Sequence, residues 1–518
     1  MPKRLRGGRT VSAALCAGLL VLTGCTTGGE TAGGTDTIRG AWITDPTTFD
    51  PALATATDDF RAVRLTYDTV VRRDSGGELV GGLASSWEQA ADRVTLGVAD
   101  GRTCADGTAI TPEVVADSLA RLADPETGSV HRIGIFGRGD ATVTADEAAG
   151  SVTVALSEPH SDLLAGLATP QAGIVCPAGT ADPAGLGAGS VEGAFSGPYV
   201  LTSSSPGVRH EFALRDDYDG WVDYSEPLAG RPAERLSFVV GAGDAVANQL
   251  LTGELDVAPV GGDEIARFDG DDSFTLTTAT TGEYYVMFNG RNGSPFADVD
   301  ARRALAQMID REALRQIVGP EGTAIATLGD ENMQCASTDT SLLQTPDPDA
   351  ATPVLDGVRV NVLGANAIGT NGAAVVYLQE RLLAAGAQVE LRNVDVGTWI
   401  SEIYDQPESW DVTLFATVNN MGTIAWGLGT VIGQPYSEGG RNTSLLRNPE
   451  ATEALEAALA ADTDEERCAE WDRAQRIALE AVDFVPISTS THSYVSREGF
   501  SLATPGGRED LTTLRIAD

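Results

Sequence analysis

Lysine is almost absent from this 518-residue chain: Lys3 is the only one, so nearly every basic residue is an arginine. The 35 basic residues face 74 acidic ones, which gives a formal net charge of −39. A chain this acidic is repelled by nucleic-acid phosphates and by anionic lipid surfaces. The charge therefore argues against nucleic-acid binding. With 42% hydrophobic residues the composition is otherwise that of a globular protein, and its length suits about three domain-sized units or two large lobes.

The residue patterns of common catalytic sites are missing as well. The chain has four histidines, and none has a metal-ligand spacing such as HExxH. No GxSxG elbow occurs, and no GxxxxGK[ST] phosphate loop is possible where lysine is lacking. The acidic turn Asp269–Asp272 does not have the spacing of a calcium loop. The sequence thus predicts a protein that is not an enzyme and has no cofactor or metal.

The amino terminus has the pattern of a secretory signal. Basic residues precede the apolar run Val11–Leu22, which as a helix spans roughly 18 Å, too short for a hydrocarbon core of about 30 Å. Leu22-Thr23-Gly24-Cys25 closely matches a bacterial lipobox, in which the cysteine is lipidated. We expect a signal peptide at 1–24, lipidation of Cys25 and a flexible tether at 25–36. The alternative is an ordinary signal peptide with a chance cysteine.

Alternating strands and helices are clearest between residues 358 and 417. Hydrophobic periodicity predicts strands at 358–363, 388–394 and 411–417, with helices at 373–385 and 398–404. This order favours parallel strands with right-handed crossovers. In the first helix we expect the inward face to consist of Val376, Leu378, Leu382 and Leu383.

Further elements follow from the same rules. Strands are expected at Thr37–Ile43, Val94–Val98 and Val152–Leu156, where apolar residues alternate. Thr111 as N-cap and Pro112 at the first helical position start a helix. A second helix begins near Asp298, with one apolar side formed by Ala301, Leu305, Met308 and Ile309.

The segment after strand 411–417 is a candidate ligand loop. In open sheets of this kind, ligands bind beyond the carboxyl ends of the strands. No charged residue occurs from Thr413 to Ser437, which is unusual in so acidic a chain. The predicted contacts are Asn419, Asn420, Met421, Thr423 and Trp426. A surface loop without a ligand is the alternative.

Short motifs in chain order carry a family resemblance. They are Asp45–Ala52 (DPTTFDPA), Tyr67–Val71, Gly77–Glu88, Asp106–Val115, Gly197–Tyr199, Gly253–Asp256, Tyr285–Asn289, Pro295–Leu305 and Ile309–Arg311. Each is weak alone, but together and in this order they are specific. From Ile38 to about Asp483 the chain resembles the family 5 extracellular solute-binding proteins, the receptors of peptide, oligopeptide and nickel ABC importers.

The resemblance implies an α/β, two-lobed periplasmic-binding-protein-like fold with an interlobe cleft and a hinge. The first lobe would be discontinuous, at 37–270 and 480–518, and the second would cover 271–479. Its implied function is capture of a small polar solute by hinge closure and delivery to an ABC permease and ATPase complex. The protein would be a monomer, lipid-anchored on the outer face of the cell membrane. The alternative is a receptor or sensor on the same fold without transport.

The resemblance also guides the expected ligand. Peptide-binding members carry an Asp in the loop that corresponds to 418–423, where it pairs with the free amine of the ligand. This chain has no carboxylate there, so a blocked peptide, an oligosaccharide or another amide-rich solute fits better than a free-amine oligopeptide. Nickel chelates would call for a cleft histidine or arginine, and no cleft histidine is expected. Tyr284, Tyr285 and Asn289, on the strand expected to join the lobes, are further candidates, with hinge packing as the alternative.

Cysteines beyond Cys25 suit an oxidising exterior, where disulfides form. Several connectivities are possible among them. The implied lobes favour Cys104–Cys176 and Cys335–Cys468, because each pair then lies within one lobe and no bridge locks the hinge. Buried free thiols are the alternative.

Overall fold

The structure, a computed structural model, describes residues 36–517. The expected signal peptide, the lipidation site Cys25 and all of the tether except Asp36 lie outside this range. Within 36–517 no helix is long and apolar enough to cross a membrane.

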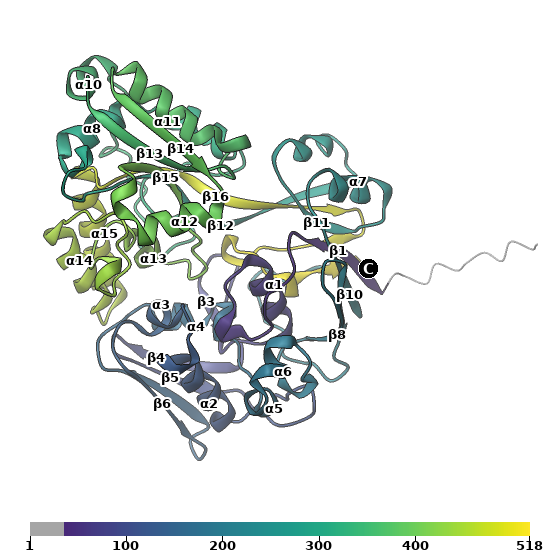
Figure 1. The fold of residues 1–518 in the computed structure, drawn as a ribbon. Helices are drawn as coiled ribbons and strands as arrows, with labels where there is room; N and C mark the ends of the chain where they lie inside the picture. Colours follow the sequence, from purple (N-terminus) through teal and green to yellow (C-terminus); the bar gives the residue numbers. More distant parts are fainter. Residues whose placement is uncertain (1–35, 518) are drawn as a thin grey trace, which may run out of the picture. The chain divides into compact units, whose positions relative to one another are not determined.

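A ten-stranded mixed sheet runs through the described chain (Figure 1). Its strands, in spatial order, are β14 (Gln388–Val394), β13 (Arg359–Ala365), β15 (Val412–Ala416), β12 (Phe274–Phe288), β16 (Phe484–Arg497), β11 (Val257–Val260), β1 (Thr37–Trp42), β10 (Arg235–Val240), β9 (Arg209–Leu214) and β8 (Tyr199–Ser205).

Strands β12 and β16 are the longest of the sheet and pair with each other in antiparallel fashion. At the end of this pair that contains Phe288, β12 also pairs with β15. Near the opposite end, β11 pairs with β16. They therefore connect the β13–β15 group to the group around β1, as the two long strands in Figure 1 show. Two irregularities in their register, after Thr280 and after Tyr284, bend the ladder near the candidate loop.

The predicted β-α-β-α-β unit is present. β13 pairs in parallel with both β14 and β15, and the helices between them are α11 (Ala373–Ala384) and α12 (Val396–Asp405). The predicted inner face of α11 is wrong in part: Val376 and Leu383 are 36% and 52% exposed. Leu378 and Leu382 are buried as predicted, together with Val375. These three are spaced i, i+3 and i+7, so α11 buries a narrower stripe than the sequence suggested.

A separate four-stranded antiparallel sheet has the order β4 (Ala84–Ala90), β5 (Arg93–Val98), β7 (Ser151–Leu156) and β6 (Ala141–Asp146). Helix α2 (Pro112–Ala123) packs on β6 and β7. Its predicted start is confirmed, because the Thr111 side chain accepts a hydrogen bond from the Val114 amide. Helix α8 (Val299–Met308), capped by Asp298, is confirmed too, and its predicted apolar side is buried.

The remaining strands form two separate two-stranded sheets, in which β2 (Val71–Arg73) pairs with β3 (Leu79–Gly81) and β17 (Phe500–Ser501) pairs with β18 (Arg515–Ile516). The remaining helices are α1 (Thr57–Thr66), α3 (Arg132–Phe136), α4 (Leu163–Leu167), α5 (Pro177–Ala181), α6 (Pro183–Ala188), α7 (Asp244–Thr252), α9 (Arg311–Val318), α10 (Pro348–Leu355), α13 (Ile424–Leu428), α14 (Pro449–Leu459) and α15 (Asp464–Glu480).

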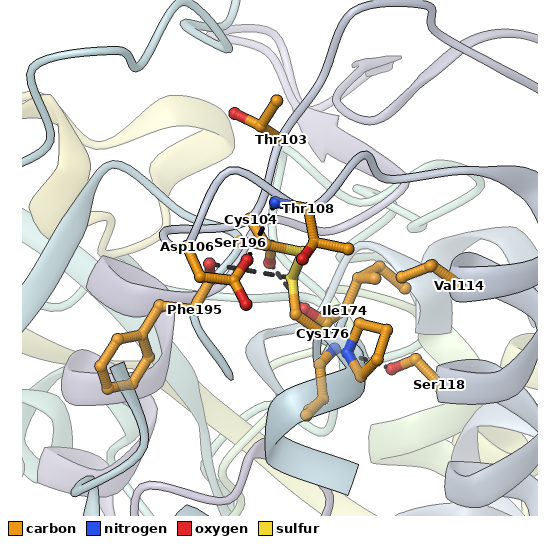
Figure 2. Close-up of a disulfide and its surroundings, with 12 residues drawn as sticks. Thr103, Cys104, Asp106, Thr108, Val114, Ser118, Ile174, Cys176, Phe195 and Ser196 are labelled. Carbon is orange, nitrogen blue, oxygen red and sulfur yellow. Dashed lines mark hydrogen bonds between the residues drawn. A yellow bond between two sulfur atoms is a disulfide. The ribbon is translucent and has the colours of Figure 1, made fainter. Parts of the chain in front are cut away.

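The structure joins Cys104 to Cys176 and Cys335 to Cys468, the two pairs expected from the implied lobes. Figure 2 shows the first bond between the loop that precedes α2 and the segment ending at Cys176, with Phe195 beside it. Its Cα atoms are 6.1 Å apart, and those of the second pair are 4.8 Å apart. Both separations lie within the usual range for disulfides.

Candidate functional site

The loop after β15 is shaped by Asn419, which has no exposed surface. Its side-chain carbonyl oxygen accepts a hydrogen bond from the Gly422 backbone amide at 3.0 Å. Its side-chain amide nitrogen donates to the Thr423 carbonyl at 3.0 Å. A further bond from the same amide reaches the Glu283 carboxylate at 3.0 Å. Asn419 thus holds the loop in place and is itself covered. Asn419 was predicted to contact the ligand, but in the structure it positions the loop instead.

Glu283 is a buried carboxylate on β12 that was not among the predicted site residues. The Thr417 hydroxyl and the Asn419 amide both donate to it. Burial raises the pKa of Glu283 from 4.5 to about 7, although these hydrogen bonds lower it. A charged residue within a central strand was the feature of the sequence that could have indicated this buried carboxylate.

Three predicted residues, Asn420, Met421 and Trp426, come together in one cavity of about 150 Å³. The opposite wall comes from α1, α3 and the turn Pro170–Ala172. We name it the Gln171 cavity; it is lined by Thr55, Thr57, Phe60, His131, Ile135, Thr169, Gln171, Val418, Asn420, Met421 and Trp426. It contains no carboxylate, in keeping with the neutral loop.

Two polar side chains distinguish this cavity. Gln171 is 2% exposed, and neither its amide nitrogen nor its amide oxygen has a partner among the described residues. Buried amides are nearly always hydrogen-bonded, so this pair is an unfilled donor and acceptor. Burial lowers the pKa of His131, which is therefore neutral near pH 7. Its Nε2 donates to the Ala54 carbonyl at 2.9 Å, which leaves Nδ1 as an acceptor.

The expectation that no histidine lies in the cleft is wrong. His131 lines the Gln171 cavity, and His160 and His492 line the two neighbouring cavities. This placement could not be predicted from local patterns, because each histidine comes from a different segment of the chain. No group of three or more His, Cys, Asp or Glu within 36–517 could hold a metal ion.

A second cavity of about 140 Å³ adjoins the Gln171 cavity and shares Thr57, Phe60, Val418 and Asn420 with it. Arginines dominate its walls, and most of them pair with carboxylates, as Arg61 does with Glu509. Two do not: the hydrogen bonds from Arg64 and Arg73 go to hydroxyl or carbonyl oxygens only. Burial, reinforced by neighbouring arginines, lowers the pKa of each to about 10. This end of the site therefore suits a ligand group that accepts hydrogen bonds.

Trp426 forms the partition between the Gln171 cavity and a larger one. Its ring lies directly on the backbone of α3, where a Cβ added to Gly134 would be 2.2 Å from the ring atom Cζ3. The Arg441 guanidinium lies 3.6 Å from the ring centroid, and the indole nitrogen donates to the Val418 carbonyl at 2.6 Å. Thr423 lines the larger cavity and not the Gln171 cavity.

The candidates from the expected hinge strand are placed differently; Tyr284 and Tyr285 lie on β12, and Asn289 directly follows its last residue. Tyr285 and Asn289 have no exposed surface. The Tyr285 hydroxyl bonds to Thr430, and the Asn289 amide donates to the carbonyls of Pro407 and Trp410. Tyr284 packs, partly buried, against the same core. None of the three lines the Gln171 cavity or its two neighbours; of β12, only Thr280 and Thr281 reach one of these cavities.

Known proteins with similar sequences and folds share this architecture. The family model for bacterial extracellular solute-binding proteins, family 5, matches residues 78–433. A substrate-binding protein from Microbacterium hydrocarbonoxydans, solved in complex with 4-hydroxybenzoate hydrazide, is 39% identical; the match covers 93% of this chain and 100% of that one, with a TM-score of 0.80.

Two relatives from Escherichia coli are more distant. The "Probable D,D-dipeptide-binding periplasmic protein DdpA" is 24% identical over 480 residues, 85% of this chain and 86% of that protein. The murein tripeptide-binding protein MppA shares the fold with a TM-score of 0.72 at 20% identity, covering 93% of this chain and 98% of that one.

These matches confirm the predicted fold class, a two-lobed periplasmic-binding-protein fold of mixed α/β content. The chain belongs to the bacterial extracellular solute-binding proteins of family 5, the binding subunits of peptide-type ABC importers.

Proposed function

We propose that this protein is a lipid-anchored receptor that captures a small, uncharged aromatic solute with an amide-like group and passes it to an ABC permease. The solute occupies the Gln171 cavity. The 39% identical relative was solved with an aromatic hydrazide, a compound of this class.

The unpartnered Gln171 amide carries the proposal. A carboxamide or hydrazide presents a carbonyl for the Gln171 nitrogen and an N–H for its oxygen, so one ligand group satisfies both atoms. The cavity of about 150 Å³ suits a single ring, since an apolar protein cavity of about 150 Å³ binds benzene. Phe60, Met421 and Trp426 supply the apolar walls. A ring substituent that accepts a hydrogen bond can face Arg64 and Arg73.

Closure of the two proposed lobes, 37–270 with 480–518 and 271–479, would enclose the ligand, with β12 and β16 as the hinge. Contacts between these segments support this arrangement. The Ser161 amide donates to the Leu459 carbonyl at 2.8 Å, and Arg73 donates to the Met421 carbonyl. Such contacts made only in the closed form let ligand binding shift the equilibrium toward closure.

Calorimetric titration tests the ligand class. Wild-type protein is titrated with 4-hydroxybenzoate hydrazide, 4-hydroxybenzamide and the capped dipeptide N-acetyl-alanyl-alanine amide. Gln171→Leu should weaken binding of the two aromatic amides about ten- to hundred-fold, because their polar groups lose buried partners. Gln406→Leu, which changes an exposed glutamine in the same way, is the control. Equal affinity in Gln171→Leu, or no binding to wild type, would show the proposal to be wrong.

The lipid anchor is tested separately at Cys25. Cells that express the full chain and are fed a radiolabelled fatty acid should incorporate the label into the wild type. Cys25→Ser should lose the label and release the protein into the medium. Label retained in the variant would exclude the anchor without affecting the ligand proposal.

A further inference from the structure

The larger cavity on the far side of Trp426 has a volume of about 360 Å³. It lies between the segments 133–162 and 421–460. Its walls are mainly apolar, formed by Ile133, Pro159, Trp426, Ile432, Leu455 and Leu459. A cavity of this size and character would exclude water from the body of an apolar guest.

One acidic side chain in its wall is unsatisfied. Asp162 is 7% exposed, and its Oδ2 has no hydrogen-bond partner among the described residues. It occupies the N-cap position of α4, where an aspartate ordinarily caps the helix, yet its side chain makes no capping bond. A buried carboxylate without a partner is costly, so a cationic partner is expected.

Neither the two arginines that line this cavity, Arg138 and Arg441, nor the nearby Arg73 donates a hydrogen bond to Asp162. Arg441 donates to the Trp426 carbonyl and lies over the ring of the same residue. Arg138 bonds to Gln434 and lies 3.8 Å from Glu456. Arg73 feels the Asp162 charge, but its guanidinium donates to the carbonyls of Gly77 and Met421.

We propose that this cavity is a second solute site, which takes a protonated amine on an apolar body, with the ammonium group on Asp162. The ammonium supplies the missing cation, and the apolar body fills the space against Leu455 and Leu459. The site is distinct from the Gln171 cavity, since Trp426 and Met421 stand between them. The carboxylate absent from the loop 418–423 is thus provided from the opposite wall.

The probes are 2-phenylethylamine and its uncharged analogue 2-phenylethanol, titrated by calorimetry into the full mature protein. Wild type should bind the amine at least about ten-fold more tightly than the alcohol. Asp162→Asn should weaken amine binding about thirty-fold or more, because the desolvated charge pair is lost. Asp117→Asn, which removes an exposed carboxylate on α2, should not change it.

A second variant tests the site without changing the Asp162 carboxylate. Leu455→Trp fills the cavity and should abolish amine binding, while 4-hydroxybenzoate hydrazide still binds at the Gln171 cavity. Failure of hydrazide binding alone would overturn the proposed function and leave this site standing. Titration with L-phenylalanine and phenylalanine amide shows whether a group next to the amine affects binding, and so distinguishes a monoamine from an amino terminus. Of the two probes, only L-phenylalanine brings a carboxylate near Arg441. Amine affinity equal to alcohol affinity, or unchanged in Asp162→Asn, would overturn the inference.

Discussion

Gly134→Ala would place a methyl group against the ring of Trp426, which rests directly on the backbone of α3. The added Cβ would lie 2.2 Å from Cζ3, whereas ordinary contacts of this kind begin near 3.4 Å. The ring would therefore have to move by more than 1 Å, which displaces the wall that the two cavities share.

The size of the effect follows from this geometry. Gly134 does not have a left-handed backbone, so alanine is compatible with α3 and by itself favours the helix by up to about 1 kcal/mol. Overpacking against a seated ring costs about 1–3 kcal/mol. If the ring meets α3 only after closure, this cost falls on ligand binding, as a loss of about five- to 150-fold in affinity.

The assay combines calorimetry with thermal unfolding of free and ligand-bound protein. Gly261→Ala is the control, because a Cβ there meets nothing within 4 Å. The double variant Gly134→Ala with Trp426→Leu should lose most of the penalty of Gly134→Ala, since the shorter side chain removes the clash. Wild-type affinity together with an unchanged melting temperature in Gly134→Ala would refute the seating of Trp426 on α3.

Three further outcomes are expected. Burial raises the pKa of Glu283 from 4.5 to about 7, so the native protein holds a proton that the unfolded chain releases between these values, and stability falls as pH rises through this window. Urea unfolding from pH 5 to 8 should show a loss of about 2–3 kcal/mol that Glu283→Gln removes; an identical slope in the variant would contradict this. Cys104→Ser and Cys335→Ser open loops of 72 and 133 residues, so each should cost about 4–5 kcal/mol, and non-reducing peptide mapping should show no crossed pairing. Asp162→Asn should raise the stability of the free protein by about 1 kcal/mol, because an unpartnered buried charge is removed; a lower melting temperature than in Asp117→Asn would speak against it.

Local patterns in the sequence predicted the elements well. The bounds of β14 agree with prediction, and the Thr111 cap starts α2, because propensity, capping and periodicity act within a few residues. Part of α11 was assigned to the wrong face, since two apolar positions flank the buried stripe and periodicity alone cannot say how wide that stripe is.

The candidate site was predicted only in part. Asn420, Met421 and Trp426 follow a parallel strand, so the topology rule pointed to their loop, and the structure brings them to one cavity. Gln171 and His131 carried no signal, because only tertiary packing brings their segments beside that loop. Tyr285 and Asn289 were predicted from the expected hinge strand, but this end of β12 lies in the hydrophobic core, so both side chains are buried away from the cavities.

Native mass spectrometry of protein purified without added ligand, followed by release and fragmentation of whatever co-purifies, identifies the solute that the Gln171 cavity holds. We expect an aromatic solute of a single ring with a carboxamide or hydrazide group, released less readily from wild type than from Gln171→Leu. A charged oligopeptide or an oligosaccharide released from the wild type, retained equally by Gln171→Leu, would contradict the proposed function.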